Sequence, residues 1–184
     1  MVVKKAKSKD WYNILAPDFF NKKEIGKTLA SESKLLLGRK IAVSAVQLTN
    51  DFNKYYLKLI FKITQVNGKN ALTEFYGSEC LRDYISRLVV RRVRRIDTVQ
   101  DLITKDGRKI RVKTITVIPR RANSSIQKSI AKKIRELVGE IVSNSTLEEF
   151  AKNLLGDEVK NKIIKEARKI YPIRHFEFRK TEVF

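Results

Sequence analysis

The chain has 184 residues, of which 40 are Lys or Arg and 20 are Asp or Glu, giving a formal net charge of +20 at pH 7. Another 42% of the residues are hydrophobic, which excludes a simple disordered polyelectrolyte and suffices for the core of one domain. A surplus of this size indicates a polyanionic partner, either nucleic acid or an anionic membrane surface.

The membrane alternative is the weaker one. No apolar run approaches the roughly 18 to 20 residues that span a bilayer, and the start of the chain, Met1 to Lys5, lacks the apolar stretch of a signal peptide. The single Cys80 and single His175 cannot form an internal disulfide or a Cys/His zinc cluster. We therefore expect a cytoplasmic protein without a membrane partner, a metal or another cofactor.

Residues 1–28 are predicted to form a basic, aromatic N-terminal arm, followed by a single domain over residues 29–184. The first nine residues carry four lysines and no acid, which is typical of a mobile tail. Trp11, Tyr12, Phe19 and Phe20 follow, and Pro17 argues against a helix there. An extended arm packed on the body of the protein is the expectation.

Alternating apolar residues predict strands over residues 41–45 and 55–63. Asn67-Gly68 predicts a tight hairpin after the second strand, and Asp106-Gly107 predicts another between residues 96–103 and 109–118. Between the hairpins, the spacing of Leu81, Ile85 and Leu88 predicts a short helix, with Ser78 as its cap.

Helical periodicity begins after Ser124 and continues to Val142. Thr146 to Glu149 has the pattern of a capping box for a second helix that ends at Gly156, and a third apolar stripe stops at Pro172. Phe176 and Phe178 alternate in a final strand. The clustered order predicts an α+β fold: an antiparallel, β-barrel-like sheet with two to three helices and a basic N-terminal extension.

The segment from Val89 to Ile96 interleaves four arginines with apolar residues. If it is extended, Arg91 and Arg95 share one face and Arg92 and Arg94 the other, where guanidinium groups suit phosphate. A solvated edge strand whose charges prevent aggregation explains the segment about equally well. The surroundings favour RNA, because residues 82–121 have a strong basic surplus whereas the C-terminal helices pair lysines with glutamates.

The candidate RNA contacts are the basic residues of the tail, the arm and the arginine-rich strands, together with one aromatic side chain. Most N-terminal aromatics are expected to pack against the domain, with Tyr12 as the exception because its tip can stay polar. The candidates are Lys4, Lys5, Lys7, Lys9, Tyr12, Lys22, Lys23, Lys27, Arg39, Lys40, Arg91, Arg92, Arg94, Arg95, Arg120, Arg121 and Lys128.

Catalysis finds little support in the sequence. His175 has no second histidine to relay protons, and Cys80 has no base. Asp97, Asp101 and Asp106 suggest a magnesium-dependent nuclease, but an Asp-Gly turn accounts for Asp106. We predict that the protein is not an enzyme.

Several short strings, in order and spacing over nearly the whole chain, resemble the archaeal and eukaryotic small-subunit ribosomal protein family S-one-e, also called S-three-A-e. Together they are specific, although each alone is weak. They are Lys9-Asp10-Trp11-Tyr12, Ala16-Pro17, Phe20, Ile25-Gly26-Lys27-Thr28, Gly68-Lys69-Asn70, Leu72-Thr73, Phe75, Gly77, Arg82-Asp83, Ile170-Tyr171-Pro172 and Arg179-Lys180.

The resemblance implies a structural protein on the platform of the small ribosomal subunit, near the messenger RNA exit. Its implied partners are the small-subunit ribosomal RNA and neighbouring ribosomal proteins, with messenger RNA close by. The resemblance implies no catalysis. The absence of a long C-terminal extension resembles the archaeal type. The alternative from the residues is a free single-stranded RNA-binding module in translation initiation or RNA decay; an RNA-processing enzyme is disfavoured.

Overall fold

The computed structural model describes residues 8–184 and contains eight strands, five α-helices and three short 3-10 helices. The strands are β1 (Asp10–Leu15), β2 (Glu24–Ala30), β3 (Lys40–Ser44), β4 (Leu57–Asn67), β5 (Asn70–Cys80), β6 (Arg94–Ile103), β7 (Lys109–Ile118) and β8 (His175–Val183). The helices are α1 (Ala45–Thr49), α2 (Arg82–Leu88), α3 (Ser124–Asn144), α4 (Leu147–Leu155) and α5 (Glu158–Ala167), with 3-10 helices η1 (Asp18–Phe20), η2 (Ser33–Leu36) and η3 (Phe52–Lys54).

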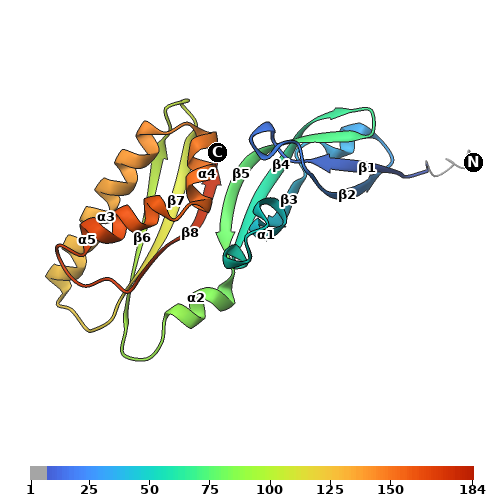
Figure 1. Cartoon of the computed structure of the whole chain (residues 1–184). Coiled ribbons are helices and arrows are strands. Elements are labelled where there is room, and N and C mark those ends of the chain that lie inside the picture. The colour runs from blue at the N-terminus through green and yellow to red at the C-terminus, as the bar shows by residue number, and fades with distance from the viewer. Residues whose placement is uncertain (1–7) are drawn as a thin grey trace, which may run out of the picture.

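All eight strands belong to one open sheet. Its main path runs β2-β1-β5-β8-β7-β6, and β4 pairs with the other edge of β5 and carries β3. Two halves result: β1 to β5 on one side, and β6 to β8 with helices α3, α4 and α5 on the other (Figure 1). The predicted α+β class is confirmed, but the sheet does not close, so "barrel-like" describes it only loosely.

Both predicted hairpins are present. Gly68 adopts a φ of 60° between paired Asn67 and Asn70, and Gly107 a φ of 74° in the loop joining β6 to β7. In the first hairpin the turn residues are Gly68 and Lys69, and only Gly68 has a positive φ, whereas the type I′ turn that Asn-Gly sequences favour needs two. The hairpins are thus where predicted, with one turn of a different type.

Two local expectations are wrong. Ser78 does not cap α2: it lies inside β5, and the residue before α2 is Leu81. Ala45 does not continue a strand but begins α1, so the chain has more helices than the two to three expected. The arm is extended, as expected, and it joins the sheet: Trp11 and Tyr12 lie in β1, which pairs with β2 and with the start of β5. The boundary predicted at residue 28 falls within β2 and stays a prediction.

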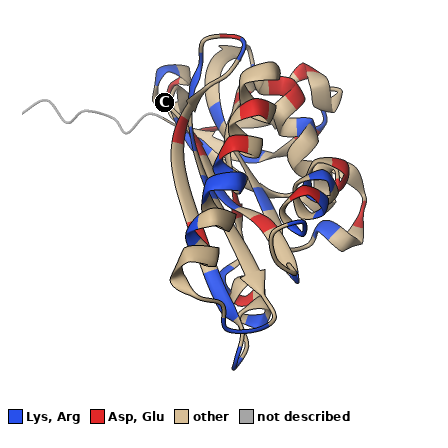
Figure 2. Cartoon of the chain, turned by 90° about the vertical axis from the view of Figure 1, so that its left-hand side faces the viewer, with Lys and Arg blue, Asp and Glu red and all other residues tan. Residues whose placement is uncertain are grey.

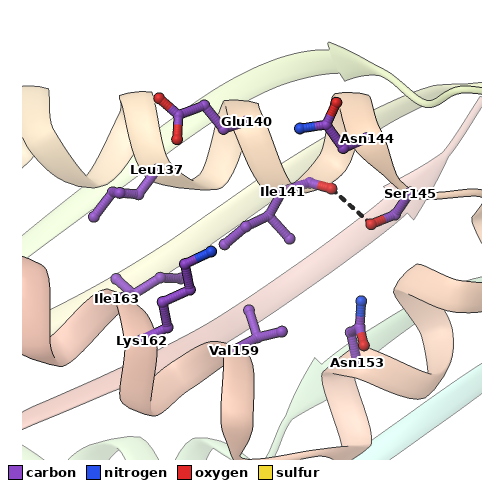
Figure 3. Close-up of a pocket in the computed structure, with 9 residues that line it drawn as sticks. All are labelled: Leu137, Glu140, Ile141, Asn144, Ser145, Asn153, Val159, Lys162 and Ile163. Carbon is purple, nitrogen blue, oxygen red and sulfur yellow. Dashed lines mark hydrogen bonds between the residues drawn. The ribbon is translucent and has the colours of Figure 1, made fainter.

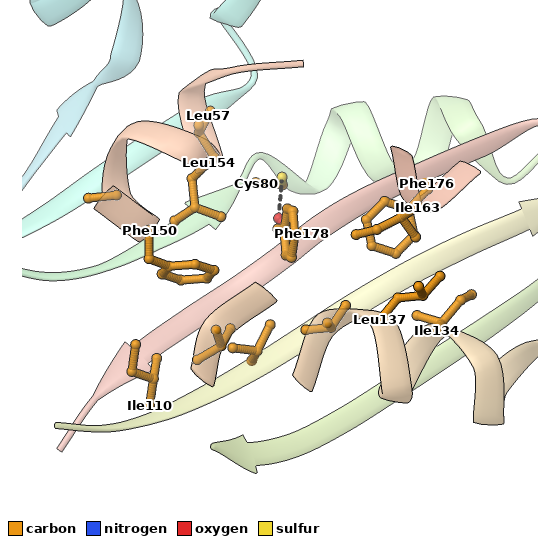
Figure 4. Close-up of a cluster of buried hydrophobic side chains, with 14 of the residues drawn as sticks. Leu57, Cys80, Ile110, Ile134, Leu137, Phe150, Leu154, Ile163, Phe176 and Phe178 are labelled. Carbon is orange, nitrogen blue, oxygen red and sulfur yellow. Dashed lines mark hydrogen bonds between the residues drawn. The ribbon is translucent and has the colours of Figure 1, made fainter. Parts of the chain in front are cut away.

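The main core lies between the helices and the inner face of β6, β7 and β8, and it continues onto β4 and β5 through Leu57 and Cys80 (Figure 4). Helix α3 buries Ile130, Ile134 and Leu137 on one stripe, as its sequence period predicts. Phe178 of β8 meets Phe150 of α4 edge to face, with ring centroids 6.1 Å apart. A smaller core around Tyr12, Leu36 and Ile63 supports the N-terminal half.

The two halves meet where β5 pairs with β8 over only three residues, Gly77 to Glu79. The backbones approach so closely that a Cβ atom on Gly77 would lie 2.1 Å from the carbonyl oxygen of Thr181. Next to it, the Ser78 amide donates to the Thr181 hydroxyl at 2.9 Å, and the Cys80 thiol donates to the Phe178 carbonyl at 3.1 Å. The seam therefore has no room for a side chain at position 77.

A buried charged network closes the same seam. Lys160 of α5 lies 2.8 Å from the Glu177 carboxylate of β8 and donates to the Tyr56 hydroxyl at 2.8 Å. The hydroxyls of Tyr56 and Tyr84 each donate to Glu177 at 3.3 Å, and their rings stack with centroids 4.0 Å apart. Burial, reinforced by the Glu177 charge, raises the pKa of Tyr56 and of Tyr84, so both hydroxyls keep their protons and remain donors.

Replacing Gly77 with alanine should lower the free energy of unfolding by roughly 1–3 kcal/mol, because the obstructing atom belongs to backbone and cannot swing aside. Denaturant unfolding of purified chains measures the change. Gly139→Ala in α3 is the matched control: its Cβ would meet only Leu102 at 3.9 Å, and helix propensity should make it more stable by up to about 1 kcal/mol. Equal stability of the two variants would contradict the steric account of the seam.

Candidate nucleic-acid interface

The start of β6 and the end of β7 bring together arginines that are far apart in the sequence. Arg94 pairs with Ile118 across the two strands, so the turn before β6 lies beside the segment that follows β7. We define the arginine cluster as the five residues that this pairing gathers: Arg91, Arg92, Arg94, Arg120 and Arg121. All five side chains are exposed. The turn before β6 is the blue loop at the bottom of Figure 2.

The arginine cluster surrounds the N-terminus of α3. One hollow is lined by Arg94, Arg121, Asn123, Ser124 and Gln127, and an adjoining hollow shares Arg121 and adds residues 92, 119 and 120. Asn123 occupies the cap position of α3 without a side-chain hydrogen bond to the helix. Free backbone N–H groups and the positive end of a 21-residue helix therefore face the same space as the guanidinium groups.

Within residues 8–184, no member of the arginine cluster forms an ion pair with a carboxylate; Arg94 instead donates to the Gln127 amide oxygen at 3.3 Å. Arg95 differs, because its side chain lies on the opposite face of β6 and makes a two-pronged contact with Asp97 at 2.8 and 2.6 Å. The cluster thus offers positive charge that the described carboxylates do not neutralise, whereas Asp97 already neutralises the charge of Arg95.

The extended conformation expected for residues 91–95 holds only from Arg94 onward. Arg91 and Arg92 lie in a turn closed by the Val93 amide and the Val90 carbonyl at 3.4 Å. Arg92 has a φ of 71°, a left-handed conformation that costs an ordinary residue roughly 1–2 kcal/mol. The condition for strand alternation is therefore not met at Arg91 and Arg92, since a turn sets their directions.

Most of the other described candidates form a second group in the N-terminal half, and the protein itself engages most of that group. Lys22 lies 3.3 Å from Asp18 and Lys27 lies 3.9 Å from Glu24. The other contacts of this group run from Lys23 to the Gln47 carbonyl and Asn50, from Arg39 to Thr28 and the Leu29 carbonyl, and from Lys40 to the face of the Tyr76 ring, 3.9 Å from its centroid.

Lys62 is not among the candidates, although the alternation of its strand predicts where its side chain lies. Its alternation with buried Phe61 and Ile63 places it on the outer face of β4. Lys40 lies opposite it in β3, and both ammonium groups approach the half-buried Tyr76. The position of Tyr76 could not be predicted from the sequence, because a register shift in the β4–β5 pairing determines where its ring lies.

Tyr12 does not have the access that we expected. Its ring belongs to the smaller core and is 9% exposed, because β1 turns alternate side chains toward that core. Trp11, on the other face of β1, is 60% exposed and lies opposite Leu29. If an aromatic of this hairpin stacks on a base, the geometry favours Trp11.

The structure does not merge the two basic groups. The arginine cluster lies at one end of the C-terminal half, and the β1–β2 hairpin lies at the far side of the other half (Figure 1). Lys9 and Lys128 are both exposed, the latter in α3 near the cluster. Lys4, Lys5 and Lys7 lie outside the described residues.

The helical layer has a different character, with Lys, Arg, Asp and Glu intermixed (Figure 2). Between α3 and α5 lies a pocket of 280 Å³ with an apolar floor and a rim that includes one acid, Glu140, and one base, Lys162 (Figure 3). The Ser145 hydroxyl beside it donates to the Ile141 carbonyl at 2.7 Å. This balanced surface has no excess of positive charge to attract a polyanion.

The carboxylates considered for a nuclease are engaged elsewhere. Asp97 pairs with Arg95, Asp101 makes a two-pronged contact with Arg111 at 2.7 Å, and Asp106 accepts from the Leu147 amide at 2.8 Å. In the part of the chain that the structure describes, no three His, Cys, Asp or Glu side chains are grouped as metal ligands. None of the helices described has the length and hydropathy needed to cross a bilayer.

The two other reactive side chains are placed as structural residues. Burial raises the pKa of the Cys80 thiol to about 12, so it is protonated at neutral pH. Burial and the neighbouring Arg174 charge lower the pKa of His175.

Comparison with known proteins agrees with these observations. The model of the ribosomal S3Ae family matches residues 1–184. The small ribosomal subunit protein eS1 of Methanopyrus kandleri is 41% identical over 187 residues, covering 100% of this chain and 89% of the relative. The eS1 proteins of Methanothrix thermoacetophila and Archaeoglobus fulgidus are 40% and 37% identical, over 97% and 95% of this chain and 85% and 84% of theirs. The chain belongs to the ribosomal S3Ae family.

Proposed function

We propose that this protein is a structural component of the small ribosomal subunit and binds ribosomal RNA through the arginine cluster and the N-terminus of α3. The observation that carries the proposal is a group of five exposed arginines without carboxylate partners among the described residues. Family membership supplies the ribosomal context, and the eS1 relatives carry the small subunit in their names. Its role is to scaffold RNA rather than to catalyse a reaction.

Phosphate suits this interface better than any other ligand. Guanidinium groups donate paired hydrogen bonds to phosphate oxygens, and the free N–H groups of α3 add donors that carry no sequence preference. Contacts of this kind position RNA by its backbone and do not read its bases. Association then releases counterions, which makes the affinity strongly dependent on salt.

The second basic group extends the proposed contact surface. Lys40, Lys62 and Tyr76 combine two ammonium groups with an aromatic ring on an outer sheet face, and Trp11 provides an exposed ring for stacking on an unpaired base. Lysines held by single exposed carboxylates, such as Lys22, can exchange that partner for phosphate, because exposed ion pairs contribute little.

The proposed location in the cell and in the particle follows from the resemblance. We place the protein in the cytoplasm, on the platform of the small subunit, beside the messenger RNA exit and the end of the small-subunit ribosomal RNA. Messenger RNA is then nearby, and the balanced helical layer is the side that meets neighbouring ribosomal proteins.

Changing Arg94, Arg120 and Arg121 together to glutamine should weaken binding to small-subunit ribosomal RNA. The slope of log affinity against log salt should fall by about 2 to 3, or roughly 0.7–0.9 for each lost phosphate contact. Filter binding across a salt series measures both quantities. The matched control changes Lys152, Lys162 and Lys165 of α4 and α5, which removes the same charge from exposed positions. An equal loss in both triple variants would mean that net charge alone binds RNA.

Arg92→Gly separates stability from binding. It removes the cost of a left-handed arginine, roughly 1–2 kcal/mol, and adds glycine's entropic penalty of roughly 0.5–1 kcal/mol, so the free chain should become slightly more stable while RNA affinity drops. Denaturant unfolding and filter binding report the two effects. Arg92→Lys keeps the charge and should retain most of the affinity. RNA binding by the glycine variant at the original strength would remove Arg92 from the interface.

Cross-linking tests the placement in the particle. A photoreactive residue replacing Ser125, in the first turn of α3, should attach to small-subunit ribosomal RNA when assembled particles are irradiated. The same residue at Ser143, in the last turn of α3, is the control and should attach mainly to protein. Both positions are exposed, so the comparison isolates the end of the helix. RNA attachment only from position 143 would reverse the proposed orientation.

A further inference from the structure

A pocket of 290 Å³ lies where four segments far apart in the sequence meet. We call it the junction pocket. Its apolar lining consists of Pro17 and Phe19 from the β1–β2 connection, Phe75 of β5 and Leu147 of α4. The volume is near the lower limit of ligand pockets, roughly 300–1,000 Å³, and suits one large apolar side chain.

The walls of the junction pocket are tied together without any occupant. Asp106 in the β6–β7 loop accepts from the Leu147 amide at 2.8 Å, and the preceding Lys105 amide donates to the Ser145 carbonyl at 3.1 Å. Arg108 of the same loop lies 4.0 Å from Glu74 of β5. The first two contacts hold the β6–β7 loop against the start of α4, and the third, between Arg108 and Glu74, links the two halves of the molecule across the pocket.

The charge of the junction pocket is opposite to that of the protein. Three carboxylates line it, those of Glu74, Asp106 and Glu148, against the single guanidinium of Arg108. Nearby Glu149 is occupied by the capping box of α4, and nearby Asp18 is paired with Lys22. In a chain with a net charge of +20, this is a local excess of negative charge around an apolar floor.

Charge therefore selects the occupant. An RNA phosphate would approach three carboxylates at close range, and like charges disfavour that contact. A basic peptide gains from the same carboxylates, while its apolar side chain gains by leaving water. Basic residues around one apolar anchor are the chemistry that fits.

We propose that the junction pocket docks a basic peptide segment of a neighbouring protein, with one large apolar side chain inserted between Phe19, Phe75 and Leu147 and flanking lysines or arginines beside Glu74 and Glu148. This proposal takes one premise from the proposed function, namely that other proteins surround the chain in a ribosomal particle. It assigns RNA and protein to separate surfaces: the arginine cluster for phosphate and the junction pocket for a cationic chain.

The isolated full chain tests this by nuclear magnetic resonance. The probe is a blocked five-residue peptide with one phenylalanine between two pairs of lysines, titrated into isotope-labelled protein. We expect saturable shifts confined to amides around the junction pocket, because an apolar lining and three carboxylates coincide there. A peptide with serine in place of phenylalanine should bind more weakly. Shifts located elsewhere, no saturation, or equal binding of the serine peptide would overturn the proposal.

Variants make the test specific. Glu74→Gln combined with Glu148→Gln should raise the dissociation constant of the phenylalanine peptide roughly 2- to 30-fold, as expected for two exposed ion pairs. Asp106 is left intact because it holds the α4 amide. The matched control, Glu136→Gln with Glu158→Gln, changes two exposed glutamates elsewhere and should bind like the original chain. Equal weakening in both double variants would overturn the proposal.

A short RNA titrated into the same protein decides between the two classes of ligand. Shifts at the arginine cluster, with none at the junction pocket, support separate surfaces. RNA shifts at the junction pocket would overturn the assignment of its occupant. Peptide binding in a chain that fails to bind ribosomal RNA would refute the proposed function and leave the pocket assignment standing, so the two failures are distinguishable.

Discussion

Strand β5 is the constraint on which the rest of the structure depends. It pairs with β4 along one edge, and along its other edge with β1 at its start and β8 at its end. The N-terminal half and the helix-covered half therefore share one strand, and the close approach of Gly77 to Thr181 fixes the distance between them. A side chain at Gly77 would separate the halves and loosen every surface that spans them.

The buried network around Glu177 gives this seam a unique arrangement. Lys160, Tyr56 and Tyr84 reach Glu177 from three different elements, and a shift of any element would leave a buried charge without its partner. Such a pair adds little net stability compared with an apolar cluster, but it penalises every alternative docking of α5 against the sheet. Close packing at Gly77 and charge pairing at Glu177 thus specify the same orientation by independent means.

Local signals made much of the fold predictable, and long-range pairing explains what was missed. The turn at Asp106-Gly107, the capping box at Thr146 and the stripe of α3 depend on nearby residues, so the sequence alone indicates them. The burial of Tyr12 depends on packing against Ala30 and Ala71, which the pairing of β1 with β2 and β5 brings close to it. The convergence of Arg92 with Arg121 likewise requires the β6–β7 register, although the arginines themselves were apparent. No short-range pattern contains that information.

The distribution of charge links folding to function. Pairing Arg95 with Asp97 and Arg111 with Asp101 removes positive charge from the sheet face opposite the helices, and the helical layer balances its own charges. One group of unpaired arginines collects at the end of the sheet beside α3, where like charges repel and Arg92 adopts an unfavourable φ. A fold selected for stability alone would have placed carboxylates or a glycine there. Repulsion and backbone strain at one site are both relieved or offset when phosphate supplies the missing negative charge, and this is the physical argument for the arginine cluster as the RNA-facing end.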